Sequence, residues 1–203
     1  MKKGLFVLVE GFDGVGKTTL SNRVARNLGY EYHKSPEGVF SEVRSAFDTE
    51  KTNFVDRLSF YSSVAIRNSI TAEQLTENGV NVIMDRYYHS IIAYHYKEYN
   101  SLSDSLKNIY KLLSQPDLVF CLELDYFIIK ERQALSGLPI KLDDQIFVRK
   151  ELHQNITEIY RNVLPKDTIF IDNSGTIEET EVQILDEINK HNEKIQLTSF
   201  PGS

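Results

Sequence analysis

The chain has 203 residues, of which 41% are hydrophobic, and this is enough for one compact domain with a buried core. Its 23 Lys and Arg residues are outnumbered by 29 Asp and Glu residues, giving a formal net charge of −6. This acidic balance argues against a broad binding surface for nucleic acids or anionic membranes.

The apolar run near the N-terminus is too short for a signal peptide, and no segment of the sequence approaches the roughly 20 apolar residues that span a membrane. We therefore expect a soluble, cytoplasmic protein that acts on small molecules rather than on nucleic acids or membranes.

Short apolar runs alternate with longer helical patterns along the chain. Strands are expected at residues 5–10, 30–33, 80–84, 118–124 and 168–171, and all but the second read as buried on both faces. Helices are expected at 17–28, at 54–77, and from 148 to a stop at Pro165. This alternation predicts an α/β fold with a parallel sheet between helices. It fits a single domain over 1–203 whose tail, from about 193 to 203, is loose.

The segment GFDGVGKTT fits the phosphate-loop pattern G-x-x-x-x-G-K-[ST], with a buried strand before it and a helix after it. Glycines let backbone amides converge on phosphate oxygens, and the helix N-terminus adds partial positive charge. Lys17 is expected to reach the β- and γ-phosphates of ATP, and the Thr18 hydroxyl to bind Mg²⁺. The competing interpretation is a glycine turn with an incidental Lys-Thr pair. The predicted ATP-binding residues in this loop are Gly11, Asp13, Gly14, Val15, Gly16, Lys17, Thr18 and Thr19.

A second charged cluster, MDRYYHS, follows the expected strand at 80–84. Asp85 stands at the C-terminal end of a buried parallel strand, where ligands bind in such sheets. A carboxylate at this point predicts a magnesium site shared with Thr18, and Arg86 beside it suits a phosphoryl oxygen. The alternative is that Asp85 caps the following helix and that Arg86 is its surface partner.

The segments VEGFDGVGKTT, DRYYHSIIAY, PDLVFCLELD and FIDNSGTIEE, in this order, resemble the thymidylate kinase family of nucleoside monophosphate kinases. The resemblance covers nearly the whole chain. It implies a P-loop NTPase three-layer fold with a five-stranded parallel sheet flanked by helices, a short lid, ATP and Mg²⁺ as cofactors, and a role in nucleotide biosynthesis. It also implies a homodimer formed through long helices, for which residues 54–77 are the candidate contact.

The resemblance also implies roles for residues that hold the phosphate acceptor. Asp13 matches the carboxylate that contacts the acceptor's sugar, and Arg86 matches the arginine that holds its phosphate. Lys34 matches a basic position close to the same phosphate. Asp85 matches the aspartate of the magnesium site.

Three further residues match the pocket for the acceptor's base. Tyr61 falls at an aromatic position that stacks on the base, Tyr94 lines the pocket, and Ser90 orients the base. The family arginine that contacts the thymine edge falls instead at Ala65, and the nearest arginine, Arg67, is expected to point elsewhere on the helix.

The loop HKSPEG also departs from the family's arginine-containing loop. With the motifs KSP, FYS and DRYYHS, it looks more like the mitochondrial UMP–CMP kinase branch of the family. The base therefore stays open among dTMP, UMP, CMP and their deoxy forms.

The expected lid, at about 133–145, contains no arginine. Phosphoryl transfer benefits from a cation over the transferring group. The candidates are Arg132 first, for both ATP binding and catalysis, then Arg149 and Lys141; the alternative is that these are solvated surface charges.

These patterns predict transfer of the γ-phosphoryl group of ATP to a pyrimidine nucleoside monophosphate, with four catalytic residues: Lys17, Asp85, Arg86 and Arg132. A second reading keeps this machinery but takes a nucleoside or a small non-nucleotide phosphate as acceptor, since fold alone does not fix the substrate. A third is a nucleotide-binding module without turnover.

Overall fold

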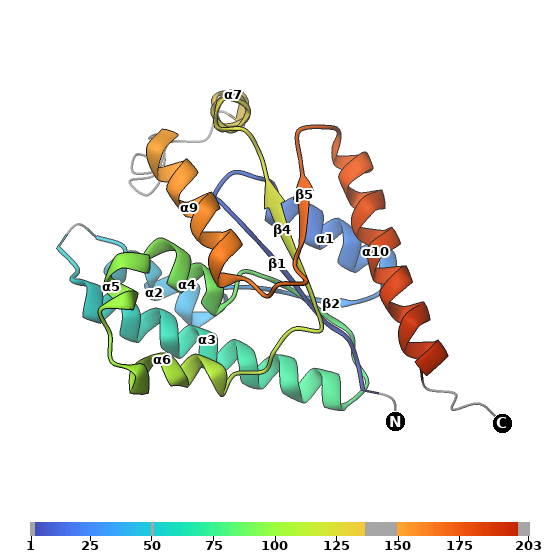
Figure 1. The fold of residues 1–203 in the computed structure, drawn as a ribbon, viewed down its shortest axis with the longest axis horizontal. Coiled ribbons are helices and arrows are strands. Elements are labelled where there is room, and N and C mark those ends of the chain that lie inside the picture. Colours follow the sequence, from blue (N-terminus) through green and yellow to red (C-terminus); the bar gives the residue numbers. More distant parts are fainter. Residues whose placement is uncertain (1–2, 50, 137–149, 199–203) are drawn as a thin grey trace.

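Five parallel strands form one sheet in the order β2-β3-β1-β4-β5 (Figure 1). The computed structural model describes residues 3–49, 51–136 and 150–198. The strands are β1 (Phe6–Gly11), β2 (Glu31–Lys34), β3 (Val82–Asp85), β4 (Leu118–Glu123) and β5 (Ile169–Asp172). Each strand expected from the sequence is present, and β1 lies at the centre with every residue buried.

Helices cover both faces of this sheet. They are α1 (Lys17–Leu28), α2 (Val39–Phe47), α3 (Phe54–Glu77), α4 (Tyr88–Tyr94), α5 (Tyr96–Asn100), α6 (Asp104–Lys111), α7 (Tyr126–Ser136), α9 (Lys150–Val163) and α10 (Ile177–Thr198). Figure 1 shows α1 and α10 on one face of the sheet and α3, α4 and α9 on the other. The α/β fold with a five-stranded parallel sheet is confirmed.

The helices predicted at 17–28 and 54–77 match α1 and α3 at both ends, and the sequence supplies a local signal for one end of each. Helix α1 ends at Gly29, which adopts a left-handed φ of 67° that favours glycine. Helix α3 begins after Asn53, whose side chain accepts a hydrogen bond from the Asp56 amide at 3.0 Å. Both signals lie within a few residues of the helix that they delimit.

Two expectations are corrected at the C-terminal side of the chain. Strand β5 is not buried on both faces: it pairs only with β4, so it is an edge of the sheet, and Phe170 is 36% exposed. The tail is not loose from residue 193, because α10 continues to Thr198. Residues 133–136 of the expected lid at 133–145 form the C-terminal end of α7, and residues 137–145 lie outside the described residues.

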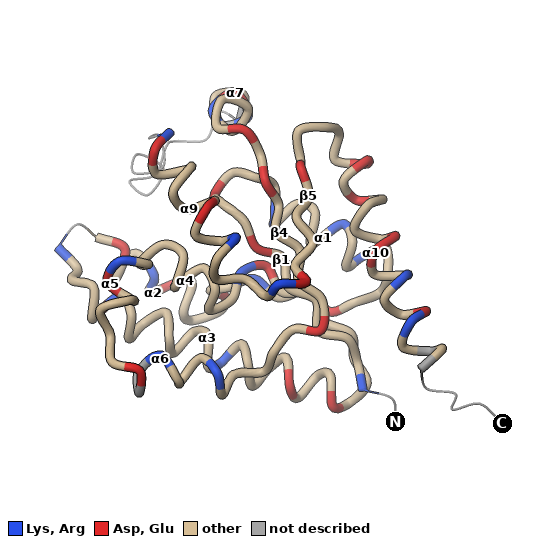
Figure 2. The backbone as a smooth tube through the Cα atoms, in the orientation of Figure 1, with Lys and Arg blue, Asp and Glu red and all other residues tan. Residues whose placement is uncertain are grey.

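The parallel register brings the C-terminal ends of three strands together. Asp85 of β3 stands beside Val9 of β1 and Lys34 of β2. Figure 2 shows Lys and Arg interleaved with Asp and Glu around the molecule rather than gathered on one face. Within the described ranges, no helix combines the length and the apolar character needed to cross a membrane.

Candidate active site

The loop between β1 and α1 owes its shape to glycines. Gly11, Gly14 and Gly16 have φ values of 137°, 83° and 93°, which L side chains rarely adopt. A Cβ atom on Gly11 would lie 2.4 Å from the Leu122 carbonyl oxygen, so a side chain does not fit there. The result is an open backbone cradle at the N-terminus of α1, which is the geometry that receives phosphate groups.

Lys17 lies over this loop in a buried position, with only 5% of its surface exposed. Its Nζ donates to the Phe12 carbonyl oxygen at 2.7 Å. Burial, with a further push from the Arg86 charge, lowers the pKa of the Lys17 ammonium to about 8. Lys17 is therefore a desolvated cation, and a nearby triphosphate would raise its pKa again.

Thr18 and Asp85 meet although 67 positions separate them. The Thr18 hydroxyl donates to Asp85 Oδ2 at 2.5 Å, and the Tyr32 hydroxyl donates to the same oxygen at 3.4 Å. Asp85 is 1% exposed, and its Oδ1 has no hydrogen-bond partner among the described residues. A buried carboxylate oxygen without a partner calls for a ligand, and this donor set of hydroxyl and carboxylate oxygens fits Mg²⁺.

The helix-capping alternative for Asp85 does not hold. Helix α4 begins at Tyr88, with Tyr87 at its N-cap and no side-chain cap. Within the described ranges no group of three or more His, Cys, Asp or Glu side chains forms a metal site. A cation here would depend on Thr18 and Asp85 together with phosphate oxygens.

Arg86 is held in an unusual backbone conformation. Among the described residues it is the only non-glycine residue with a positive φ, 73°. Its Nη2 forms an ion pair with Asp13, and its guanidinium lies over the Tyr94 ring, 5.4 Å from the ring centroid. Burial opposes ionisation of Asp13, but the charges of Arg86 and Lys17 outweigh it and lower the Asp13 pKa.

A buried network behind Arg86 includes two residues that the sequence did not reveal, Glu10 and Tyr160. Arg86 Nη1 donates to the Ser90 hydroxyl at 3.0 Å, and that hydroxyl donates to Glu10 Oε2 at 2.6 Å. The Tyr160 hydroxyl donates to the same Glu10 oxygen at 3.2 Å, and the Tyr87 amide donates to the other oxygen at 2.9 Å. Burial raises the pKa of Glu10. The sequence signal for this network was Glu10 itself, a charged residue inside an otherwise apolar strand.

Ser90 therefore stands with its hydroxyl already engaged by this network. Its expected role in orienting the base stays a prediction, while its contact with Arg86 supports a second role in holding the guanidinium.

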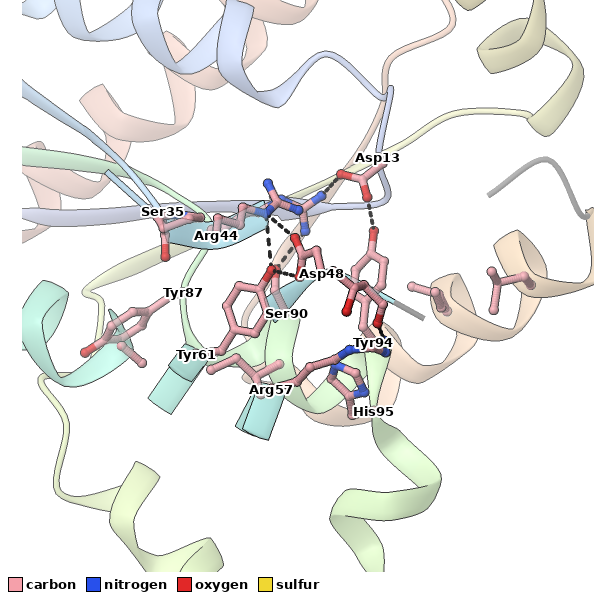
Figure 3. A pocket seen from close by; sticks show the side chains of 17 residues that line it. Asp13, Ser35, Arg44, Asp48, Arg57, Tyr61, Tyr87, Ser90, Tyr94 and His95 are labelled. Atoms are coloured by element: carbon pink, nitrogen blue, oxygen red, sulfur yellow. Dashed lines mark hydrogen bonds and ion pairs between the residues drawn. The ribbon is translucent and has the colours of Figure 1, made fainter. Parts of the chain in front are cut away.

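A cavity of about 240 Å³ opens beside Arg86 and Asp13. Figure 3 shows the side chains that surround it. The predicted residues Asp13, Tyr61, Arg86, Ser90 and Tyr94 all line it, as does Ala65. The remaining lining residues are Ser35, Pro36, Arg44, Asp48, Thr49, Arg57, Tyr87, Ile91, His95, Leu152 and Ile156.

Two basic residues discussed from the sequence lie away from this cavity. Lys34 is exposed at the end of β2 and does not line the cavity, and Arg67 points to solvent from α3. The acceptor role of Lys34 stays a prediction, and the expectation that Arg67 points elsewhere agrees with its exposed position.

The first candidate for a cation over the phosphates, Arg132, contacts the loop between β5 and α10. Its Nη2 donates to the carbonyl oxygens of Asn173 at 2.9 Å and Gly175 at 3.4 Å. Its predicted catalytic role stays untested by this arrangement. The other two candidates, Lys141 and Arg149, lie outside the described residues.

Asn173 is a further residue that the sequence did not reveal. Its Nδ2 donates to the Val15 carbonyl oxygen at 2.6 Å, and its Oδ1 accepts from the Thr180 hydroxyl at 2.7 Å. The side chain is 3% exposed. Asn173 thus links the glycine loop to the end of β5 through its hydrogen bond to Val15.

Comparisons with known proteins place these features in context. The family model described as thymidylate kinase matches residues 9–184. The thymidylate kinase of Dictyostelium discoideum is 30% identical over 98% of this chain and 91% of its own, and that of Leptospira borgpetersenii is 29% identical over 85% and 87%. The solved thymidylate kinase of Candida albicans superposes with a TM-score of 0.73 at 21% identity, covering 93% of each chain, which shows a shared fold.

Proposed function

The chain belongs to the thymidylate kinase family of nucleoside monophosphate kinases, and from this premise we propose that it transfers the γ-phosphoryl group of ATP to a pyrimidine nucleoside monophosphate. The supporting observation is the position of the Arg86–Asp13 pair. It lies between the glycine loop on one side and the cavity of about 240 Å³ on the other. An acceptor phosphate bound in that cavity would meet the end of a triphosphate held by the loop.

The proposed mechanism is direct, in-line transfer without a covalent enzyme intermediate. The loop amides and Lys17 hold the donor phosphates, and Arg86 holds the acceptor phosphate. Asp13 fixes the Arg86 guanidinium and offers its second oxygen, now 3.1 Å from the Tyr94 hydroxyl, to the acceptor's sugar. Mg²⁺ at Thr18 and Asp85 would neutralise charge on the phosphates. Arg132 remains our first candidate for an additional cation.

The acceptor's base is the finer part of the proposal. The curated relatives are thymidylate kinases, which makes dTMP the first acceptor to test. Ala65 lines the cavity where the sequence resemblance expected an arginine, so dUMP, UMP, CMP and dCMP belong in the same test. Tyr61 offers its ring to the base from α3.

The test is ADP release from ATP and Mg²⁺ with these five monophosphates, their nucleosides, and small phosphorylated metabolites. We expect turnover confined to pyrimidine monophosphates and abolished in Lys17→Ala. Lys190→Ala, which removes an exposed lysine of α10, is the matched control and should behave as wild type. Turnover only with a nucleoside or a non-nucleotide phosphate would refute the acceptor class. Equal rates for wild type and Lys17→Ala with every acceptor would refute the kinase assignment.

We also propose that the protein forms a homodimer through α3. Val55, Ile66 and Ile70 are 63%, 41% and 40% exposed. Their spacings of 11 and 4 residues place them on one face of the helix. Light scattering after size exclusion should give twice the mass of the chain for wild type and a lower mass for Ile66→Glu with Ile70→Glu. A monomeric wild type would refute the proposal.

A further inference from the structure

Tyr32 of β2 brings its hydroxyl to the pair formed by Thr18 and Asp85, although no sequence motif assigns it a role. Strand β2 pairs in parallel with β3 so that Lys34 stands beside Asp85. Side chains two positions apart on a strand share a face of the sheet, so the Tyr32 side chain lies on the same face as Lys34 and Asp85. Thr18 reaches Asp85 from α1, which covers this face (Figure 1). The strand register therefore delivers a second hydroxyl to Asp85, from a third element.

The two oxygens of the Asp85 carboxylate are used differently. Its Oδ2 accepts from the Thr18 hydroxyl at 2.5 Å and from the Tyr32 hydroxyl at 3.4 Å. Its Oδ1 is buried and has no hydrogen-bond partner within the described ranges. Two donors on one oxygen restrict rotation of the carboxylate, and they leave the other oxygen for a cation.

Thr18 and Tyr32 differ in what else their hydroxyls can do. A hydroxyl has one proton and two lone pairs, so Thr18 can donate to Asp85 and still offer its oxygen to Mg²⁺. The ring of Tyr32 is partly buried and packs against the hydrophobic core, which restrains the hydroxyl at its end. Tyr32 is therefore suited to hold the carboxylate while Thr18 binds the cation.

We propose that Tyr32 is a positioning residue for the magnesium site, whose hydroxyl holds Oδ2 of Asp85 and keeps Oδ1 for the cation. This inference rests on the proposed function, because it requires Mg²⁺ to bind with ATP at Thr18 and Asp85. Hydrogen-bond partners behind a metal ligand orient it, and their loss typically lowers metal affinity about 10- to 100-fold. The contact of Tyr32 is long, so its loss should have an effect at the lower end of this range.

The test measures the affinity of the cation itself, with Mn²⁺ as a spectroscopic probe in place of Mg²⁺. Each protein is held in excess over a non-hydrolysable ATP analogue, and electron paramagnetic resonance gives the dissociation constant of Mn²⁺ from the complex. Calorimetry in EDTA gives the affinity for the same analogue without metal. Tyr32→Phe removes the hydroxyl and keeps the ring. The matched control is Tyr30→Phe, because the Tyr30 hydroxyl accepts from Asn192 of α10 at 3.3 Å instead.

We expect Tyr32→Phe to weaken Mn²⁺ binding about tenfold and to leave the metal-free affinity for the analogue within about twofold of wild type. Tyr30→Phe should change neither. Mn²⁺ affinity as little affected as in Tyr30→Phe would overturn the proposal. Equal losses with and without metal would overturn it in favour of a contact with the nucleotide.

A double-mutant cycle tests whether Tyr32 acts through Asp85. When Asp85→Asn has already removed the carboxylate, adding Tyr32→Phe should change the Mn²⁺ affinity by less than about twofold. Losses that multiply would overturn the positioning role in favour of a separate contact of Tyr32 with the cation. The turnover assay of wild type decides the proposed function separately: turnover beside an unchanged Mn²⁺ affinity in Tyr32→Phe would refute this inference alone. A wild-type complex that binds no Mn²⁺ would refute the magnesium site and this inference together.

Discussion

Replacement of Asn173 by Asp tests whether this side chain fastens the glycine loop. The two residues have nearly the same shape, but the carboxylate places an oxygen where Nδ2 now donates to the Val15 carbonyl oxygen at 2.6 Å. The hydrogen bond from Thr180 at 2.7 Å is kept. The variant therefore loses one buried bond and gains a repulsive contact between two oxygens at a site that is 3% exposed.

The expected cost follows from these changes. Loss of a buried bond with an acceptor left unsatisfied costs about 1–3 kcal/mol, and an unpaired buried charge raises this to roughly 3–5 kcal/mol. Asn173→Ala loses both hydrogen bonds but buries no charge, so it should cost about 1–3 kcal/mol. The order of stability is wild type, then Ala, then Asp.

Urea unfolding followed by far-ultraviolet circular dichroism measures these values, since the chain has no Trp for fluorescence. Asn162→Asp is the matched control: this exposed Asn on α9 donates to the Glu158 carbonyl oxygen at 3.1 Å, and the change should stay within about 0.5 kcal/mol. The affinity for ATP should fall about tenfold in Asn173→Asp, because the loop backbone shifts, and should stay unchanged in the control.

The pH dependence provides a second check on Asn173→Asp. Burial beside a carbonyl oxygen raises the folded-state pKa of the new carboxyl above its unfolded value, so its protonated form fits better. The stability gap to wild type should narrow as pH falls from 7.5 toward 5. A gap that does not vary with pH, or equal losses in the Asp and Ala variants, would refute the argument.

Three further predictions concern the same site. Because the Lys17 pKa is about 8 and a bound triphosphate raises it, ATP binding at pH 8 should take up about half a proton in wild type and none in Lys17→Ala. For the same reason the affinity of wild type for ATP should fall between pH 7 and pH 9.5. Calorimetry in two buffers of different ionisation enthalpy measures both the affinity and the proton uptake. Gly16→Ala would place a Cβ atom 2.8 Å from the side-chain Nδ2 of Asn173, whereas the Cβ of Gly29→Ala would meet nothing within 4 Å. Gly16→Ala should therefore lower the free energy of unfolding more than Gly29→Ala. Comparable losses would contradict this argument. Tyr160→Phe removes the hydroxyl that donates to the Glu10 carboxylate, so it should lower the free energy of unfolding by about 1–2 kcal/mol and lower kcat/KM for the acceptor. An unchanged melting temperature would show that this hydrogen bond contributes little to stability.

Local signals in the sequence account for the elements that were predicted well. The apolar run of β1, the glycines of the loop and the stop at Gly29 each act within a few residues. The segment GFDGVGKTT between β1 and α1 also contains the residue types that bind phosphate. Lys17, Thr18 and Asp85 could be singled out as candidates for this reason, and the structure brings Thr18 and Asp85 into contact. The family resemblance added the acceptor role of Asp13 and the aromatic residues Tyr61 and Tyr94, which all line the cavity. It also added Lys34, which does not.

Features that depend on the order of the strands were not readable from the chain. An apolar run does not reveal whether its strand is central or at an edge, so β5 was wrongly expected to be covered on both faces. One partner of Glu10, Tyr160, lies 150 positions away along the chain, and one partner of Asn173, Val15, lies 158 positions away.

The lining of the cavity shows the same limit at the level of the site, because it includes Arg44 and not Lys34. In sequence, Lys34 belongs to the loop HKSPEG, and Arg44 is one of two charged residues on a short helix. Only the packing of α2 against α3 turns Arg44 into the cavity and secures it on Asp48 and Tyr61. The sequence by itself determined which phosphate-binding chemistry this chain carries, because backbone conformation and residue type are local properties. The tertiary structure alone decided which side chains line the cavity, because that depends on contacts between elements that are distant in sequence.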